Sequence, residues 1–219
     1  MVKYDKAQSF SVQVAIDGNK NWPLADTQIT ALTPVSDKYY PAQPIAHVDR
    51  PIPFGFAGNV GGVNARDKQG RLGGRRPLVA AMMQFGLKIR DRDKGTGDLR
   101  AAAASYKGCA DYLSSCRITP NFAMTGSYDR MHVKGRVVEV GLAGGCLLEM
   151  KGSPTPDWFE KGVDYLEWDT IEDARNIVKR LKDAPEETQA IGERLRKKVM
   201  ENHSPARFWE RIFDRIGMA

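Results

Sequence analysis

The sequence is short of cysteine, and it contains no hydrophobic run long enough to cross a membrane. Its 219 residues include only three cysteines, Cys109, Cys116 and Cys146, and their number and spacing indicate no metal site. No stretch of about 18 apolar residues occurs, and charged residues run through the first twenty positions, unlike a signal peptide. These absences predict a soluble, cytoplasmic protein without a membrane span.

The sequence also lacks a single block of positive charge, although its formal net charge is +6. Over residues 172–201 basic side chains alternate with acidic ones, as on the solvated face of a helix. Two clusters, at residues 66–76 and 130–136, are less balanced. Neither has the interleaved aromatic residues that stack on bases, so no nucleic acid is expected as a partner. A phosphorylated ligand is compatible with both clusters.

Residues 1–50 carry little that predicts regular structure. Apolar residues alternate at Phe10, Val12, Val14 and Ile16, which predicts a strand over residues 10–16 with one buried face. Five prolines between residues 33 and 53 predict an extended connector, because proline fixes φ and donates no hydrogen bond. We therefore interpret residues 1–50 as a strand and a connector, and residues 51–219 as the main domain.

The main domain reads as an α/β fold. Apolar runs predict strands over residues 52–57, 88–90, 117–123, 146–150 and 163–168. Helical spacing predicts helices over residues 77–85, 101–113 and 134–144, and three more that begin near residues 170, 185 and 204. This alternation implies a Rossmann-like, mainly parallel sheet with helices on both faces and a helical C-terminus. Ligands of such sheets bind at the carboxyl ends of the strands.

A glycine-rich stretch over residues 58–62 follows the first strand of this domain. It matches neither a Walker A loop nor the G-x-G-x-x-G fingerprint. Backbone N–H groups in such loops suit phosphate oxygens, which makes Gly58 and Asn59 candidate phosphate contacts. A plain tight turn explains the same residues equally well.

The helix predicted over residues 134–144 begins with two cations, Lys134 and Arg136. The N-terminus of a helix disfavours positive charge, so an anion bound between them and the helix would account for their position. Two solvated side chains are the alternative. Glu139 lies one turn further along, where its carboxylate could accept hydrogen bonds from the vicinal hydroxyls of a ribose. It could also be an acid that only favours the helix dipole.

The spacing of Arg136, Glu139 and Gly144 resembles the R-x-x-E-x-x-x-x-G pattern of group 1 glycosyltransferases of the spore-maturation-protein type. The resemblance extends over about residues 30–215. It implies one half of a glycosyltransferase type B enzyme, of the hexosyltransferase type, whose C-terminal domain binds a nucleotide sugar without a metal or other cofactor. On this resemblance Glu139 would hold the ribose, and Arg136 with Gly58 and Asn59 would face the diphosphate.

Two departures from the family pattern bear on catalysis. Related retaining families carry a glutamate eight positions before the ribose-binding one, where this chain has Met131. Residues 1–50 also hold no acceptor-side Rossmann domain, so we assign no catalytic residue, and the acceptor is unknown. His132 has no partner that the sequence identifies, and His47 and His203 are expected to be structural.

These features leave three functions open. The chain is a donor-binding half of a glycosyltransferase, a non-catalytic module that binds a nucleotide or sugar phosphate, or an assembly protein that retains the fold. A homo-oligomer or a separate acceptor-domain chain is the expected partner.

Overall fold

The protein is built around a five-stranded parallel sheet. The computed structural model describes residues 13–16, 28–58, 75–90, 99–124 and 131–218. The strands stand in the order β4-β3-β5-β6-β7, and every neighbouring pair is parallel. Their bounds are β3 Ile52–Ala57, β4 Lys88–Arg90, β5 Cys116–Pro120, β6 Cys146–Met150 and β7 Leu166–Trp168. The predicted α/β fold with a parallel sheet is confirmed.

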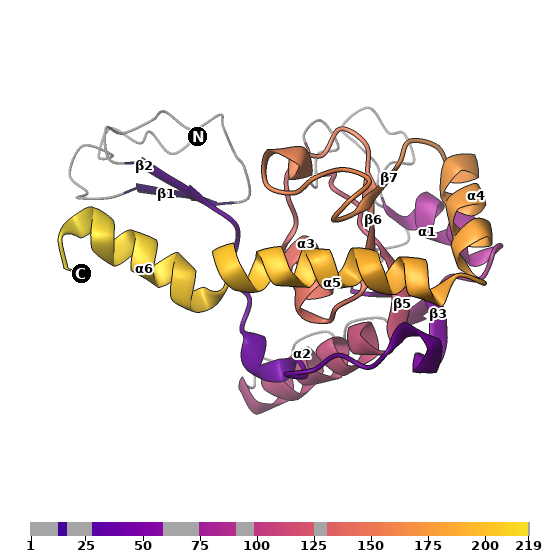
Figure 1. Cartoon of the computed structure of the whole chain (residues 1–219), viewed down its shortest axis with the longest axis horizontal. Helices are drawn as coiled ribbons and strands as arrows, with labels where there is room; N and C mark the ends of the chain where they lie inside the picture. Colours follow the sequence, from indigo (N-terminus) through magenta and orange to yellow (C-terminus); the bar gives the residue numbers. More distant parts are fainter. Residues whose placement is uncertain (1–12, 17–27, 59–74, 91–98, 125–130, 219) are drawn as a thin grey trace.

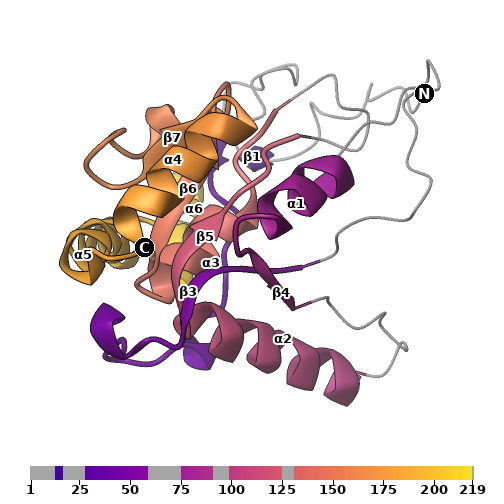
Figure 2. The ribbon, with the colours of Figure 1, turned by 90° about the vertical axis from the view of Figure 1, so that its right-hand side faces the viewer.

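Helices cover both faces of this sheet (Figures 1 and 2). Helices α1 and α4 contact each other on one face, whereas α2 and α3 contact each other on the other, where α5 packs along α3. The bounds are α1 Arg75–Met83, α2 Leu99–Ser114, α3 Gly135–Leu142, α4 Ile171–Leu181, α5 Pro185–Asn202 and α6 Pro205–Ile216. The helices predicted from residue 170 onward begin at the side-chain caps Thr170 and Ser204 and at Pro185.

The strand order reverses in the middle of the sheet, between β3 and β5. From β3 the chain passes through α1 to β4 on one side, and from β5 it passes through α3 to β6 on the other. The helices that follow β3 and β5 therefore lie on opposite faces of the sheet and diverge from the carboxyl ends of these two strands. Such a switch point is where ligands of open parallel sheets bind.

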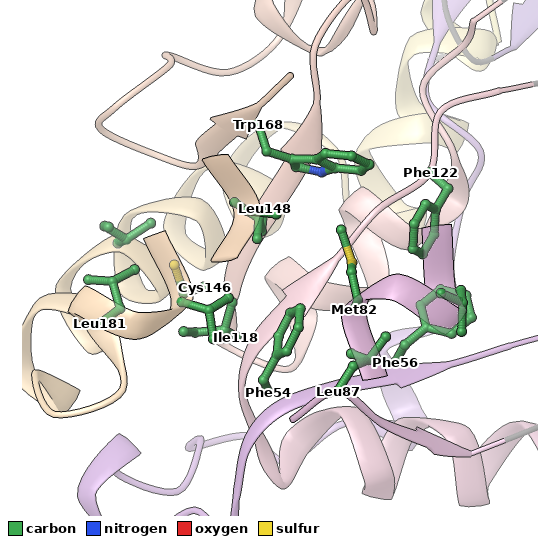
Figure 3. Packing of buried hydrophobic residues seen from close by; sticks show 14 residues of the cluster. Phe54, Phe56, Met82, Leu87, Ile118, Phe122, Cys146, Leu148, Trp168 and Leu181 are labelled. Atoms are coloured by element: carbon green, nitrogen blue, oxygen red, sulfur yellow. The ribbon is translucent and has the colours of Figure 1, made fainter. Parts of the chain in front are cut away.

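Alternation along the strands divides the core between the two faces. Phe54, Phe56 and Leu148 pack with Met82 of α1 and with Trp168, as Figure 3 shows. The ring of Phe122 meets those of Phe56 and Trp168 edge to face, with centroids 5.4 and 6.0 Å apart. On the opposite face Leu147 packs with buried residues of α3 and α5, namely Val137, Val138, Val140, Leu142, Leu195 and Val199. Both faces of the inner strands β3 and β6 are covered, so these two strands read as mainly apolar runs.

Two glycines permit a close approach of α5 to the end of α3. A Cβ on Gly192 would collide with the carbonyl of Gly144, and Gly144 itself has φ +64°. Because backbone atoms cannot move aside as a flexible side chain can, Gly192 has no tolerable replacement in this packing. This contact holds α3 against the C-terminal helices.

The N-terminal region contains one strand more than the sequence predicted. Strand β1, Gln13–Ile16, pairs in parallel with β2, Gln28–Ala31, whose four residues are too short to show a pattern. Phe10 and Val12 lie outside the described residues. The pair lies beside α6, apart from the main sheet (Figure 1). The placing of a domain boundary near residue 50 stays a prediction.

The proline-rich connector is ordered by its contacts with the main domain. It contains two short 3-10 helices, η2 Asp37–Tyr39 and η3 His47–Asp49. Val35 packs into the cluster that contains Val137 of α3, and the ring nitrogens of His47 lie 2.7 Å from the carbonyl oxygen of Gly144 and 2.8 Å from Oγ1 of Thr188. The connector thus follows α3 from its first turn to its end. Burial lowers the pKa of His47 to about 4, consistent with the expected structural role.

Candidate functional site

Arg136 lies at the switch point of the sheet. Its side chain extends from the first turn of α3, and Nη2 donates to the carbonyl oxygen of Ala57, the last residue of β3. The guanidinium lies over the ring of Phe56 at 5.4 Å, and the side chain is 15% exposed. The predicted cation therefore lies at the carboxyl end of β3, with a small part of it open to solvent.

Gly58 meets Arg136 directly after β3. Its φ is +142°, and a Cβ at this position would lie 2.9 Å from Nη2 of Arg136. Only glycine combines this backbone conformation with such a close guanidinium. The structure thus brings Gly58 and Arg136 together, whereas Asn59 and the rest of the 58–62 stretch lie outside the described residues.

A second arginine reaches the same edge from the opposite face of the sheet. Arg75, the first residue of α1, lies over the rings of Phe56 and Phe122 at 5.6 and 5.8 Å. The other candidates of this basic cluster at residues 66–74 lie outside the described residues. Two guanidinium groups over one phenylalanine ring give this edge of the sheet positive charge where the two helices diverge.

Glu139 lies next to Arg136 on α3 and is 17% exposed. Its Oε2 is 2.8 Å from Nη1 of Arg136, and its Oε1 accepts a hydrogen bond of 3.2 Å from the hydroxyl of Tyr106. The nearby ring of Tyr40 is largely buried, and this burial, with the charge of Glu139, raises the pKa of Tyr40. The carboxylate is therefore oriented by partners from the same helix and from α2.

Tyr106 and Tyr40 were not predicted as site residues. Tyr106 lies in an alanine-rich helix, and Tyr40 follows η2 in the connector. Their rings reach Glu139 only because α2, α3 and η2 pack together. No local pattern in the sequence marks either tyrosine, and the contact of Tyr106 with Tyr39, whose ring centroids lie 5.7 Å apart, also arises only in the folded chain.

Lys134 occupies the N-cap position of α3, where its side chain makes no capping hydrogen bond. Its Nζ instead contacts Nε2 of His132. The sequence identified no partner for His132, whereas in the structure the segment before α3 places this ring against the lysine. His203 is structural as expected, since its ring lies edge to face with Trp158 and Phe159 and burial lowers its pKa to about 4.

Within the part of the chain that the structure describes, no three His, Cys, Asp or Glu side chains cluster as metal ligands would. No described helix is long and apolar enough to pass through a lipid bilayer.

Several solved structures share this fold. The HepE protein of Anabaena, in a complex with UDP and glucose, superposes with a TM-score of 0.58 at 11% identity, over 90% of this chain and 58% of its own. For sucrose-phosphate synthase of Thermosynechococcus elongatus the TM-score is 0.56 at 13% identity, over 88% and 52%. A mutant of S. aureus TarM, bound to UDP and sugar ligands, gives 0.59 at 12%, over 96% and 45%.

These matches show the fold of one half of a glycosyltransferase type B enzyme, since the chain spans about half the length of each matched protein. A search of the curated proteins gave no match to the sequence. One family model, described as glycosyl transferase-like, matches residues 71–214. That segment contains α1, β5, α3 and the site residues Arg136 and Glu139, and the chain belongs to this glycosyl transferase-like family.

Proposed function

We propose that this chain is the donor-binding half of a glycosyltransferase, and that it binds a nucleotide sugar at the carboxyl ends of β3 and β5. One observation carries the proposal. Gly58 and the Arg136–Glu139 pair come from different parts of the sequence and meet at the carboxyl edge of the sheet. Within its family we assign the chain to the spore-maturation-protein type, on the spacing of Arg136, Glu139 and Gly144.

The chemistry of these groups suits the two polar parts of a nucleoside diphosphate. A planar guanidinium beside a helix N-terminus favours a diphosphate, and Lys134 adds charge at the same helix start. A carboxylate that is already oriented by two donors retains lone pairs for the hydroxyls of a ribose. No metal is part of the proposal, because Arg136, Lys134 and Arg75 can offset the charge of the diphosphate.

The first test is binding of nucleotide sugars, starting with UDP-glucose because HepE and TarM bind UDP. At about 100 times its dissociation constant, a ligand should stabilise the fold by roughly 2.7 kcal/mol in thermal unfolding. Absence of stabilisation by every nucleotide and nucleotide sugar would favour an assembly protein. Binding without sugar transfer or hydrolysis, in the presence of candidate acceptors, would favour a non-catalytic module.

We expect Glu139→Gln to weaken nucleoside binding without unfolding the protein. The amide replaces a charged acceptor by a neutral one, which should cost about 1.5–3 kcal/mol of binding free energy. Isothermal titration calorimetry with UDP and with uridine measures this loss, which should appear for both ligands because both carry the ribose.

Glu172→Gln is the matched control for Glu139→Gln. Glu172 makes an ion pair of the same i,i+3 kind with Arg175, at 2.7 Å, but on the exposed surface of α4. The control should bind uridine as the wild type does. A folded Glu139→Gln protein with unchanged affinity removes Glu139 from the ribose site.

We also propose that α6 is a contact surface for a second copy of this chain. Trp209, Phe213 and Ile216 lie on one side of α6 and are 51%, 43% and 36% exposed, although β2 packs against the same helix. The parallel pair of β1 and β2, with four residues in each strand, is too small to cover this side of α6 alone. Light scattering over a concentration series should therefore detect dimers.

Substitution of the two aromatics of α6 tests this contact. Trp209→Glu with Phe213→Glu should give a monomer near 24.4 kDa. Val48→Glu is the control, because Val48 is 64% exposed on η3 in the connector. A wild-type protein that stays monomeric at high micromolar concentration contradicts the proposal.

A further inference from the structure

A carboxylate that the proposed site does not use is buried at the carboxyl edge of the sheet. Glu149, near the end of β6, is 1% exposed. Its two oxygens accept hydrogen bonds from Nδ2 of Asn121, at 3.1 and 2.9 Å, and one also accepts from the backbone N–H of Met150 at 2.9 Å. The hydroxyl of Thr155 donates to the other oxygen at 3.1 Å. Every described partner donates, so the arrangement is matched to the ionised carboxylate.

These hydrogen bonds join two loops that leave the sheet side by side. Asn121 directly follows β5, and from there the chain leads back to α3 through an N–H of His132 that donates to Ala123 at 3.1 Å. Thr155 belongs to the loop after β6 and is held by Ser153, with the two hydroxyl oxygens 2.7 Å apart.

A second contact between these loops lies nearer to the site. A Cβ on Gly152 would be 3.1 Å from the sulfur of Met131, so the loop after β6 touches the segment that precedes α3. That segment ends at Lys134, the N-cap of α3. A shift of the loop after β5 at Asn121 therefore moves the start of α3, where the proposed phosphate contacts are.

We propose that Glu149 is a positioning residue, whose ionised carboxylate holds the loop after β5 and the loop after β6 together and thereby sets Lys134 and Arg136 for a diphosphate. The inference rests on the proposed function of that site. Glu149 is too buried to touch a ligand, so it acts only through the segment between Asn121 and α3.

Protonation of Glu149 should loosen this connection. Burial raises the pKa of Glu149 to about 7, while the hydrogen bond from Asn121 and those from Met150 and Thr155 oppose the rise. A protonated carboxyl carries an O–H that needs an acceptor, whereas Asn121 Nδ2 offers only donors. The affinity for a nucleotide sugar should therefore fall as the pH drops through about 7.

The stability of the fold should change in the opposite direction. Because the pKa is raised in the folded state, the native protein binds more protons than the unfolded chain between the ordinary glutamate value and about 7. The contribution of Glu149 to the free energy of unfolding is thus largest at low pH and is lost as the pH rises through about 7. A loss of affinity at low pH is therefore not a sign of unfolding.

Other charged groups near Glu149 shape the pH profile in ways that can be separated. Glu167, its neighbour on β7, adds negative charge and raises the pKa of Glu149 further, and Tyr165 lies close by. His132 and Lys134 lie on the segment itself. A proton on His132 would add positive charge and strengthen anion binding, whereas a proton on Glu149 is expected to weaken it.

The experiment measures binding of UDP-glucose and of uridine by calorimetry between pH 5.5 and 8.5. UDP-glucose is preferred to UDP because a phosphate monoester titrates near pH 6 and a sugar diphosphate does not. At pH 8, Glu149→Gln should weaken UDP-glucose about tenfold, which is the effect of one displaced charge-assisted contact, and uridine less than about twofold. In Glu149→Gln the affinity for UDP-glucose should also no longer fall as the pH drops through about 7.

Three further variants make the result specific. Adding Asn121→Asp to Glu149→Gln exchanges the acceptor and the donor, and should restore most of the affinity. Thr155→Val removes one donor, leaves the acid in place and should weaken UDP-glucose by about threefold, a fraction of one hydrogen bond. Glu167→Gln is the control, since Glu167 stands opposite Glu149 on β7 with an exposed lysine as its partner, and at pH 8 it should bind as the wild type does.

Equal losses for UDP-glucose and uridine, or no rescue by Asn121→Asp, would show a general structural role and overturn the inference. Hydrogen exchange of the His132 amide tests the same connection without ligand, since this N–H donates to Ala123 in the connected segment. Its protection should fall in Glu149→Gln, and unchanged protection also overturns the inference. If the wild type binds no nucleotide while this protection does fall, the proposed function fails and the loop connection stands.

Discussion

Replacing Arg136 with alanine is expected to remove most of the affinity for a nucleoside diphosphate and to leave the bare nucleoside almost unaffected. The guanidinium spans from α3 to the carbonyl of Ala57 at the carboxyl end of β3. Losing its charge-assisted contacts with a diphosphate should cost about 2–3 kcal/mol, or roughly 30- to 150-fold in dissociation constant. Calorimetry with UDP and uridine measures the two affinities separately.

Arg175→Ala provides a matched control for Arg136→Ala. Arg175 also lies over a phenylalanine ring, that of Phe85 at 5.6 Å, and also pairs with a glutamate three residues away, but it does so on the surface of α4. The control should bind UDP normally. If Arg136→Ala loses UDP and uridine to the same extent, Arg136 supports the structure of this edge of the sheet and does not contact phosphate.

Replacing Arg50 with methionine is expected to cause the largest loss of stability. Arg50 is 1% exposed, and its guanidinium donates to the carbonyl oxygens of Ile45, Cys116 and Ala143, at 3.0, 2.7 and 2.8 Å. Methionine fills much of the volume but leaves three carbonyls without a donor. We expect the free energy of unfolding to fall by about 3 kcal/mol, because each buried acceptor left unpaired is costly.

Urea unfolding of Arg50→Met and Arg117→Met compares two arginines that each donate to three carbonyl oxygens, one buried and one half-buried. Arg117 also donates to three carbonyls, of Arg50, Val48 and Lys182, but at 3.3–3.5 Å and nearer the surface. Water can replace its hydrogen bonds, so Arg117→Met should cost less than about 1 kcal/mol. Similar losses for both variants would mean that burial of Arg50 does not carry the effect.

Local patterns predicted the elements of the main domain well. The strand over residues 146–150 is observed with the same bounds, because a run that is apolar except for Glu149, between glycines and a charged turn, leaves little choice. Helix α4 begins where Thr170 caps it, at the predicted start near residue 170. Strand β2 was missed, because Gln28–Ala31 gains its strand structure from pairing with β1 and not from its own four residues.

Within the candidate site, the sequence singled out Gly58, Arg136 and Glu139 and said nothing of what surrounds them. The hydrogen bond between Arg136 and Ala57 joins residues 79 positions apart, and the one between Tyr106 and Glu139 joins residues 33 apart. Nothing local in the sequence marks either pair. The parallel sheet brings them together because α2 and α3 both run back along it from its carboxyl edge.

The sequence by itself determined the α/β class of this protein, the order of its helices and strands, and the helix start that carries two cations and an acid. It did so because periodicity, caps and glycines act over a few residues. The tertiary structure alone decided that Arg136 meets β3, that Tyr40 from the connector reaches Glu139, and that Glu149 is buried against Asn121. Such contacts depend on strand order and on desolvation, and both arise only when distant segments pack.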